Sequence, residues 1–441
     1  MAILPQSSLF CWQEIEDLRD LERLRLAIEY LPDESLMRRL EADRGQGRDD
    51  YPVRAVWNSI LAGIVFQHPS VESLRRELQR NPSLRQACGF DPLKGMDAVP
   101  SPRAYTHFLQ LLLAHPDLVD AIFDELVERL RTELPGFGRI LAIDGKALWT
   151  HARPRGKDAT VPPADGRRDI DADFGVKTKH GKHDDGTAWE KVTKWFGYRV
   201  HLVVDAEYEL PVAYEVTKAS VGEAPQAHRL LDRLEERHPG LLEACEAWDG
   251  DKGYDDGKMI RGLWDGHEIL PVIDIKEMWK EPDPTRVLPG HRRIVYDQHG
   301  TVYCHCPKTG QCRRMAYGGF EADRMTQKFR CPATHYGVEC QGRAECEVKG
   351  SLRVPLETDR RIFTPLARAS YTWKKTYKNR TAVERVNSRL DVSFGFEQHF
   401  IRGQAKMRLR MSLALMVMLA MAYGRIKEKQ QDKMRSLVGA A

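Results

Sequence analysis

The sequence lacks the segments that would direct a chain into a membrane or out of the cell. Residues 1–18, MAILPQSSLFCWQEIEDL, contain neither the basic nor the apolar region of a secretory signal. The longest apolar run, from Met411 to Gly424, is shorter than the roughly 20 residues that a helix needs to span a bilayer. We therefore expect a soluble, cytoplasmic protein in which this run forms a buried helix.

An excess of charge of one sign is also missing. The 441 residues carry a net charge of only +4, so the net charge gives little reason to expect a nucleic-acid partner. Evidence for such a partner has to come from how the charges are distributed along the chain. Hydrophobic residues make up 42% and charged residues 30%, which is ordinary for a globular protein. The length allows two or three domains.

Cysteine is scarce outside one segment, because six of the nine cysteines lie between residues 304 and 346. Without an export signal, such a cluster favours a metal site over disulfides. The spacings fit the paired knuckles of zinc sites poorly, so a structural zinc ion and reduced thiols in an irregular subdomain both remain open. The candidate ligands are Cys304, Cys306, Cys312, Cys331, Cys340 and Cys346.

Residues 10–134 have the apolar periodicity of helices. Short helices with exposed Arg75, Arg76, Arg80 and Arg85 suit a DNA-binding domain, and the same pattern also fits a plain helical bundle. From residue 139 the pattern changes to strands. RILAID, residues 139–144, is a short apolar strand that ends in a carboxylate, and residues 197–217 alternate as a β-hairpin.

The segment 151–195 between these strands is hydrophilic, and we expect a long loop that orders on DNA or stays a flexible surface loop. Ser220 and Glu223 fit a capping box at the start of the next helix. Strands near 244–249 and 267–273 complete the series.

Strand, hairpin, helix, strand, helix and strand in this order predict an α/β fold with a ribonuclease H-like mixed sheet and flanking helices. An all-helical N-terminal domain would precede it, and a Cys-rich insertion would interrupt it. The expected boundaries are 1–135 for the helical domain, 136–274 and 366–428 for the two parts of the sheet domain, 275–365 for the insertion and 429–441 for a flexible tail.

The stretch AWDGDKGYDDGK, residues 247–258, places four aspartates among three glycines. An EF-hand calcium loop that starts at Asp249 would need a ligand at position 5 and glycine at position 6, where the sequence has Gly253 and Tyr254. A calcium loop is therefore excluded. A catalytic metal site instead needs carboxylates from separate elements, and Asp144 and Asp251 each follow a predicted strand that could be parallel neighbours.

A third ligand is expected from the predicted helix YTWKKTYKNRTAVERVNSRLD. Its residues Tyr377, Arg380, Glu384 and Asp391 are spaced by three, four and seven, so they share one face of the helix. An acid among bases on such a face is what a Mg²⁺ and phosphate site requires, because carboxylates hold the ion and arginine binds phosphate.

AIDGK, DKGYDD and YKNRTAVERVN, in this order, resemble the DDE transposases of bacterial insertion sequences. More narrowly, they resemble the subgroup whose signature is Tyr, two residues, Arg, three residues, Glu, six residues and Lys. Tyr377, Arg380 and Glu384 match this spacing, but Asp391 occupies the lysine position. The phosphate contact of that lysine must then come from another residue, of which Arg389 is the nearest. The likeness covers residues 45–425.

The resemblance implies that Asp144, Asp251 and Glu384 bind two Mg²⁺ or Mn²⁺ ions, and that Arg380 and Tyr377 position the scissile phosphate. It implies a transposase that cleaves the ends of its mobile element and joins the freed 3′-hydroxyl to target DNA without a covalent enzyme intermediate. The partners would be double-stranded element ends and target DNA, bound by a homodimer at the bacterial nucleoid. Asp249, Asp255 and Asp256 are interpreted as turn and helix-start residues.

Residues 371–410 carry seven more basic than acidic side chains, with Tyr371, Trp373 and Tyr377 among them. This pattern is typical of a contact with duplex DNA, and a solvated charged face would share it. The predicted DNA contacts are Lys374, Lys375, Lys378, Arg385 and Arg389. Two further functions remain open: a catalytically inactive DNA-binding protein derived from a transposase, and a metal-dependent nuclease that joins no strands.

Overall fold

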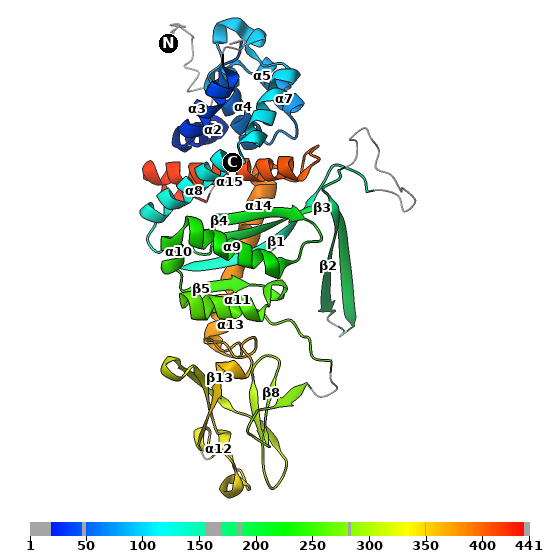
Figure 1. The fold of residues 1–441 in the computed structure, drawn as a ribbon, viewed down its shortest axis with the longest axis vertical. Helices are drawn as coiled ribbons and strands as arrows, with labels where there is room; N and C mark the ends of the chain where they lie inside the picture. The colour runs from blue at the N-terminus through cyan, green and yellow to red at the C-terminus, as the bar shows by residue number, and fades with distance from the viewer. Residues whose placement is uncertain are drawn as a thin grey trace.

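The computed structural model describes residues 19–45, 50–154, 169–183, 185, 187–280, 284–348 and 350–435. Figure 1 shows three regions along the long axis: a group of N-terminal helices at one end, a mixed sheet in the middle, and the Cys-rich insertion at the other end. Residues 436–441 of the predicted tail lie outside the described residues.

The first region is helical, as the sequence predicts, but Arg85, expected to be exposed, is buried because its guanidinium donates to the carbonyls of Leu78 and Gln79. Its helices are α2 (Arg19–Tyr30), α3 (Glu34–Arg44), α4 (Val53–Val65), α5 (Val71–Arg80), α6 (Pro82–Cys88), α7 (Pro102–Ala114) and α8 (Pro116–Glu133). The C-terminal helix α15 (Gln404–Lys427) packs on α2, α8 and the sheet, so the two ends of the chain share one hydrophobic core.

The apolar run in α15 is a buried core helix, as predicted. Among the described residues, α15 alone is long and apolar enough to cross a membrane, and 78% of its most apolar window is buried inside the protein. Buried methionines and leucines of this helix contact apolar residues of both the helical region and the sheet. It therefore ties the helical region to the sheet.

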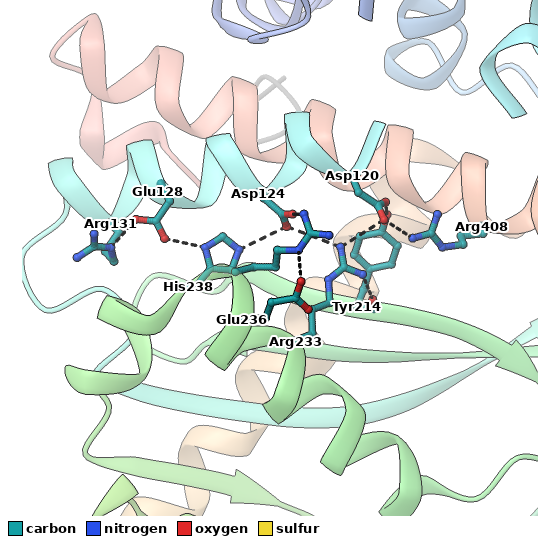
Figure 2. Close-up of polar contacts among 10 residues, drawn as sticks. Asp120, Asp124, Glu128, Arg131, Tyr214, Arg233, Glu236, His238 and Arg408 are labelled. Atoms are coloured by element: carbon teal, nitrogen blue, oxygen red, sulfur yellow. Dashed lines mark hydrogen bonds and ion pairs between the residues drawn. The ribbon is translucent and has the colours of Figure 1, made fainter. Parts of the chain in front are cut away.

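A row of carboxylates on α8 also joins the two regions. Asp120, Asp124 and Glu128 are spaced by four and share one helix face. Figure 2 shows this row between α15 and the helices on the sheet. Arg408 of α15 donates a hydrogen bond of 2.5 Å to Asp120, and His238, which precedes α10 (Pro239–Glu243), lies 2.6 Å from Glu128 Oε1.

The central sheet has the order β4 (Leu210–Lys218), β3 (Ala188–Asp205), β1 (Ile140–Trp149), β5 (Ala247–Gly250) and β6 (Leu270–Ile273). Strands β4, β3 and β1 are antiparallel, whereas β1, β5 and β6 are parallel. Helix α9 (Glu223–Arg237) contacts β3 and β4, and α14 (Thr381–Phe394) crosses β1 and β3 on the other face. The short helix α11 (Gly257–Arg261) precedes β6.

Part of the segment expected to be a loop is a β-hairpin, so that prediction was wrong there. Strand β2 (Asp173–Lys182) pairs with the first half of β3, from Asp173 opposite Gly197 to Lys182 opposite Ala188. Figure 1 shows this hairpin projecting from the sheet. The periodicity gave no strand signal because side chains on both faces of the hairpin are exposed.

The insertion is regular rather than irregular. One sheet contains β7 (Thr285–Val287), β8 (Ile294–Asp297), β9 (Val302–His305) and β10 (Cys312–Arg314). A second sheet contains β11 (Ala316–Glu321), β12 (Thr326–Arg330) and β13 (Ser351–Pro355). The short helix α12 (Pro332–His335) lies in the connection between β12 and β13. The two sheets enclose a separate hydrophobic core that includes Ile294, Phe329 and Phe363.

Candidate active site

Asp144 and Asp251 lie where the pairing of two adjacent parallel strands ends, and β1 itself continues beyond the expected strand end at residue 144 to Trp149 because it stays paired with β3. The paired register of β1 and β5 ends with Ile143 opposite Gly250, and the two aspartates are the next residue of each strand. Asp144 is buried, and its Oδ1 accepts a hydrogen bond of 2.8 Å from the Gly145 amide. Asp251 Oδ1 accepts one of 2.8 Å from the Gly253 amide. The sheet therefore fixes the backbone of both predicted ligands.

Arg380 places the third predicted ligand, Glu384, next to this sheet edge. Its guanidinium lies between two carboxylates, with Nη2 3.0 Å from Glu384 Oε1 and Nη1 3.7 Å from Asp144 Oδ2. The Glu384 side chain is 54% exposed, and it lies in the first turn of α14. The arginine thus stands where Asp144 and Glu384 would otherwise face each other.

Tyr377 supports Arg380 from the preceding helix, α13 (Tyr371–Tyr377). Its ring stacks on that of Trp373, with centroids 4.7 Å apart and planes inclined by 14°. The Arg380 guanidinium carbon lies 5.8 Å from the centroid of the Tyr377 ring, within the range of a cation–π contact. Burial raises the pKa of Tyr377 to about 12, so this hydroxyl stays protonated at neutral pH.

The electrostatic effects at Asp144 and Glu223 show that carboxylates gather at this site. Burial raises the pKa of the Asp144 carboxyl; the positive charge of Lys177 opposes this shift, and the negative charge of Asp251 adds to it. Burial likewise raises the pKa of Glu223, and again Asp251 adds to the shift. Neighbouring carboxylate oxygens of this kind are suited to a divalent cation.

The carboxylates are not yet gathered around one point. Within the described ranges, no group of three or more His, Cys, Asp or Glu side chains is arranged to hold a metal ion. The Arg380 guanidinium lies between Asp144 and Glu384 and separates these two carboxylates.

The other aspartates of residues 247–258 have different roles. Asp249 is no turn residue, because it lies within β5 with 0% exposure, and neither of its carboxyl oxygens has a hydrogen-bond partner among the described residues. Burial raises its pKa well above the ordinary value, and the positive charge of Arg380 opposes this shift. Asp255 binds Arg361 at 2.7 Å. Asp256 caps α11 through the amides of Lys258 and Met259, which confirms a helix-start role.

Asp391, which replaces the lysine of the subgroup signature, is paired with a lysine from the sheet. Lys146 Nζ donates hydrogen bonds of 2.6 Å to Asp391 Oδ2 and 3.0 Å to Glu397 Oε1. Lys146 follows Asp144 by two residues in β1, so both side chains emerge on the same face of the strand. The cation nearest to this position is therefore Lys146, which the sequence did not single out.

The predicted DNA contacts divide into two groups. Lys374, Lys375 and Lys378 are exposed on α13 and the turn that follows it. Arg385 and Arg389 both bind the carboxylate of Glu209 in the β3–β4 turn. The two arginines therefore hold α14 against that turn.

The β2–β3 hairpin adds basic residues that the predicted loop already contained. Lys177 and Lys194 are exposed on it, and the positive charge of Lys177 acts on Asp144 and Glu223. Trp195 packs flat against Gly175 of the paired strand, where a Cβ would lie 2.2 Å from the indole ring. This packing explains why an otherwise polar segment forms a hairpin beside the candidate site.

Glu223 is the site residue that sequence reasoning misplaced. No capping box forms, because Gly222 is the N-cap of α9 without a side-chain cap, and Ser220 Oγ instead donates to Asp173. The Glu223 carboxylate turns toward the sheet edge, where Oε1 accepts a hydrogen bond of 2.9 Å from Arg199. A glutamate at a helix start can either cap the helix or turn toward another segment, so the local sequence could not distinguish these two roles.

The cysteine cluster converges on one pocket of the insertion. Cys304, Cys306, Cys331, Cys340 and Cys346 line it, whereas Cys312 is exposed on β10. Hydrogen bonds from Thr309 lower the pKa of Cys306 to about 6, which favours its thiolate at neutral pH. The fold thus brings together cysteines that are distant in sequence, although no three of the described ones are arranged around a single ion.

Comparisons with known proteins match most of the chain. The family described as Transposase DDE domain matches residues 135–420, and the family described as Transposase domain (DUF772) matches residues 12–111. No curated protein matches the chain. Among solved structures, the chain is similar to the piggyBac transposase in a synaptic complex with hairpin DNA, with 11% identity and a TM-score of 0.41 over 97% of this chain and 80% of that chain.

Proposed function

The chain belongs to the Transposase DDE domain family, a family of DNA-processing enzymes, and we propose that it cuts the ends of its mobile element and joins the freed 3′-hydroxyl to target DNA. One observation carries this proposal. Asp144 and Asp251 continue adjacent parallel strands from the last paired residues, and Glu384 lies across Arg380 from Asp144. This is the order and placement of acids that the resemblance to insertion-sequence transposases implies.

We assign Asp144, Asp251 and Glu384 as ligands of two Mg²⁺ or Mn²⁺ ions. The residues fit such ions because carboxylate oxygens are their preferred donors, and because the buried Tyr254 hydroxyl beside these acids has no hydrogen-bond partner in the part of the chain that the structure describes. When bound, the ions would activate the attacking oxygen and neutralise charge on the leaving oxygen. Glu384 would join the other two acids once Arg380 leaves the space between them.

Arg380 has two roles in this account. In the described state its guanidinium neutralises Asp144 and Glu384. Once released from these two carboxylates, the planar Arg380 guanidinium would bind two oxygens of the scissile phosphate. The Tyr377 ring, which stacks on Trp373 of α13, would keep the guanidinium in place. The displacement would be in line, with DNA oxygens or water as nucleophiles and no covalent link to the enzyme.

The strand order supports assignment of the sheet as ribonuclease H-like. Three antiparallel strands, β4, β3 and β1, continue into two parallel strands, β5 and β6, and the expected insertion separates β6 from the helix that carries Glu384. We also assign the chain to the subgroup with the Tyr, Arg and Glu spacing of residues 377–384. We retain the domain boundaries expected from the sequence, with residues 1–135 as a domain that binds element ends.

Double-stranded DNA is the proposed partner, and synapsis of two element ends would require a homodimer. The exposed lysines of α13 and the lysines of the β2–β3 hairpin lie on elements that flank the acids, so they would contact the phosphate backbone on both sides of the cut. Arg385 and Arg389 contribute less directly, because Glu209 already neutralises them.

The experiment uses the purified protein and the DNA that flanks its own gene, with Mg²⁺ or Mn²⁺. The expected products are nicks at the element ends and strands joined to a target plasmid, and a substrate with scrambled ends should be neither cut nor joined. Cutting without end specificity or joining would instead identify a nuclease. Tight binding to the ends without cutting in either metal would identify an inactive DNA-binding relative.

A further inference from the structure

Glu223 is a fourth carboxylate at the proposed metal site. It opens α9, and its side chain is largely buried beside Asp144 and Asp251. Arg199 of β3 donates a hydrogen bond of 2.9 Å to Oε1. This contact orients the carboxylate and leaves Oε2 on the side of Asp251.

Two glycines show how closely Glu223 approaches the predicted ligands. Gly145 follows Asp144, and a Cβ at this position would lie 3.1 Å from Glu223 Oε1. Gly253 follows Asp251 by two residues, and a Cβ there would lie 1.8 Å from Glu223 Oε2 and 2.9 Å from Asp251 Oδ1. The space between the carboxylates of Glu223 and Asp251 is therefore open only because residue 253 has no side chain.

A second, independent feature points to a ligand at this position. Tyr254 is completely buried, and its hydroxyl has no hydrogen-bond partner among the described residues. A Cβ at Gly145 would lie 3.5 Å from this hydroxyl, so the hydroxyl is directed toward the same space as Glu223 Oε1. A buried hydroxyl without a partner is unfavourable, and an ion-bound oxygen would satisfy it.

We propose that Glu223 is a further ligand of the divalent cation site, with Oε2 beside Asp251 and with the Tyr254 hydroxyl donating to an oxygen at the ion. The inference rests on the proposed function, because Asp144 and Asp251 are assigned to the same ion. Arg199 acts as a positioning residue, since it contacts the ion only through Glu223. Glu223 would then hold the ion while Glu384 is still paired with Arg380.

The test is direct binding of Mn²⁺ to the full-length protein, measured by electron paramagnetic resonance without DNA. The variants are Glu223→Gln, Asp144→Asn and Asp251→Asn, and the matched control is Glu235→Gln, an exposed carboxylate on the same helix. Glu223→Gln should raise the Kd for Mn²⁺ at least tenfold, as should both aspartate variants. Glu235→Gln should leave the Kd unchanged, and thermal melting in the absence of metal checks that each variant folds.

The outcomes separate this inference from the proposed function. If the aspartate variants weaken Mn²⁺ binding and Glu223→Gln does not, the assignment of Glu223 is wrong and the triad stands. If none of the three variants changes Mn²⁺ binding, both assignments fail together. Should Glu223→Gln not fold, Gly253→Ala replaces it, because the added methyl would separate Glu223 from Asp251 while keeping both carboxylates. Wild-type affinity in a folded Gly253→Ala protein would overturn the inference.

Discussion

Lys146 of β1 and Asp391 of α14 form a partly buried ion pair, with the ammonium 2.6 Å from the carboxylate. Both side chains are mostly buried, at 12% and 29% exposure. Lys146 follows Asp144 by two residues. The pair therefore fixes the helix that carries Glu384 relative to the strand that carries Asp144.

Asp391→Lys should destabilise the protein by about 1–3 kcal/mol, because two ammonium groups would then meet at a partly buried position. The double exchange Lys146→Asp with Asp391→Lys should recover part of the loss, since opposite charges face each other again. Urea denaturation of the wild type, both single variants and the double variant gives the coupling. Strictly additive effects would show that the two residues do not interact.

Arg380→Ala should increase the response of the protein to metal. In the wild type the guanidinium already neutralises Asp144 and Glu384, so an ion has to compete with it. Without that guanidinium the acids repel each other, and Mn²⁺ should raise Tm by several degrees more than in the wild type. Arg385→Ala, which removes a neighbouring arginine bound to Glu209, is the control. An equal or smaller Mn²⁺ effect in Arg380→Ala would contradict the competition.

Acid should destabilise the sheet through His201. Burial lowers the pKa of this histidine to about 3, from an ordinary value near 6.5. The unfolded chain binds a proton at His201 below pH 6.5 and the folded chain does not, so stability is lost as pH falls from 6.5 toward 3. This site accounts for about 2 kcal/mol between pH 7 and pH 5. His201→Gln should remove that component from urea midpoints, and an unchanged pH dependence would rule it out.

The cysteine pocket should contain one zinc ion per chain. Five cysteines from separate parts of the insertion line one pocket, and a zinc ion would bind them as thiolates. Mass spectrometry of the purified protein measures the zinc, and Cys304→Ser with Cys331→Ser should abolish it, whereas Cys245→Ser should not. A metal-free protein whose thiols react freely with a thiol reagent would show that the pocket contains reduced cysteines and no zinc site.

The strands that carry the predicted ligands were readable because their local signals agree. RILAID and the segment before Asp251 are short, apolar and followed by acids, and these strands are indeed adjacent and parallel. The alternation in residues 197–217 likewise predicted β3 and β4, although nearly every residue of β4 is buried on both faces of the strand. Patterns of this kind depend only on neighbouring residues and on burial of a whole face.

The remaining features depend on contacts between distant segments. The β2–β3 hairpin has no buried face along its outer half, so alternation gave no signal, and its Trp–Gly packing joins residues 20 apart in sequence, Gly175 and Trp195. Asp249 looked like a turn residue among glycines, yet the sheet encloses it. The sequence pattern around Glu223 fits a capping box, but in the structure its carboxylate contacts Arg199 of β3. Only the fold reveals this contact.

The most direct test of the central assignment is single-turnover cleavage of element-end DNA with Mn²⁺. Asp144→Asn, Asp251→Asn and Glu384→Gln should each reduce the cleavage rate by at least about 10³-fold while still binding the ends. Asp256→Asn, which alters the cap of α11 and the contact with His228 in the same aspartate-rich stretch, should stay within a few-fold of the wild type. Cleavage at the wild-type rate in any of the three variants would contradict the triad.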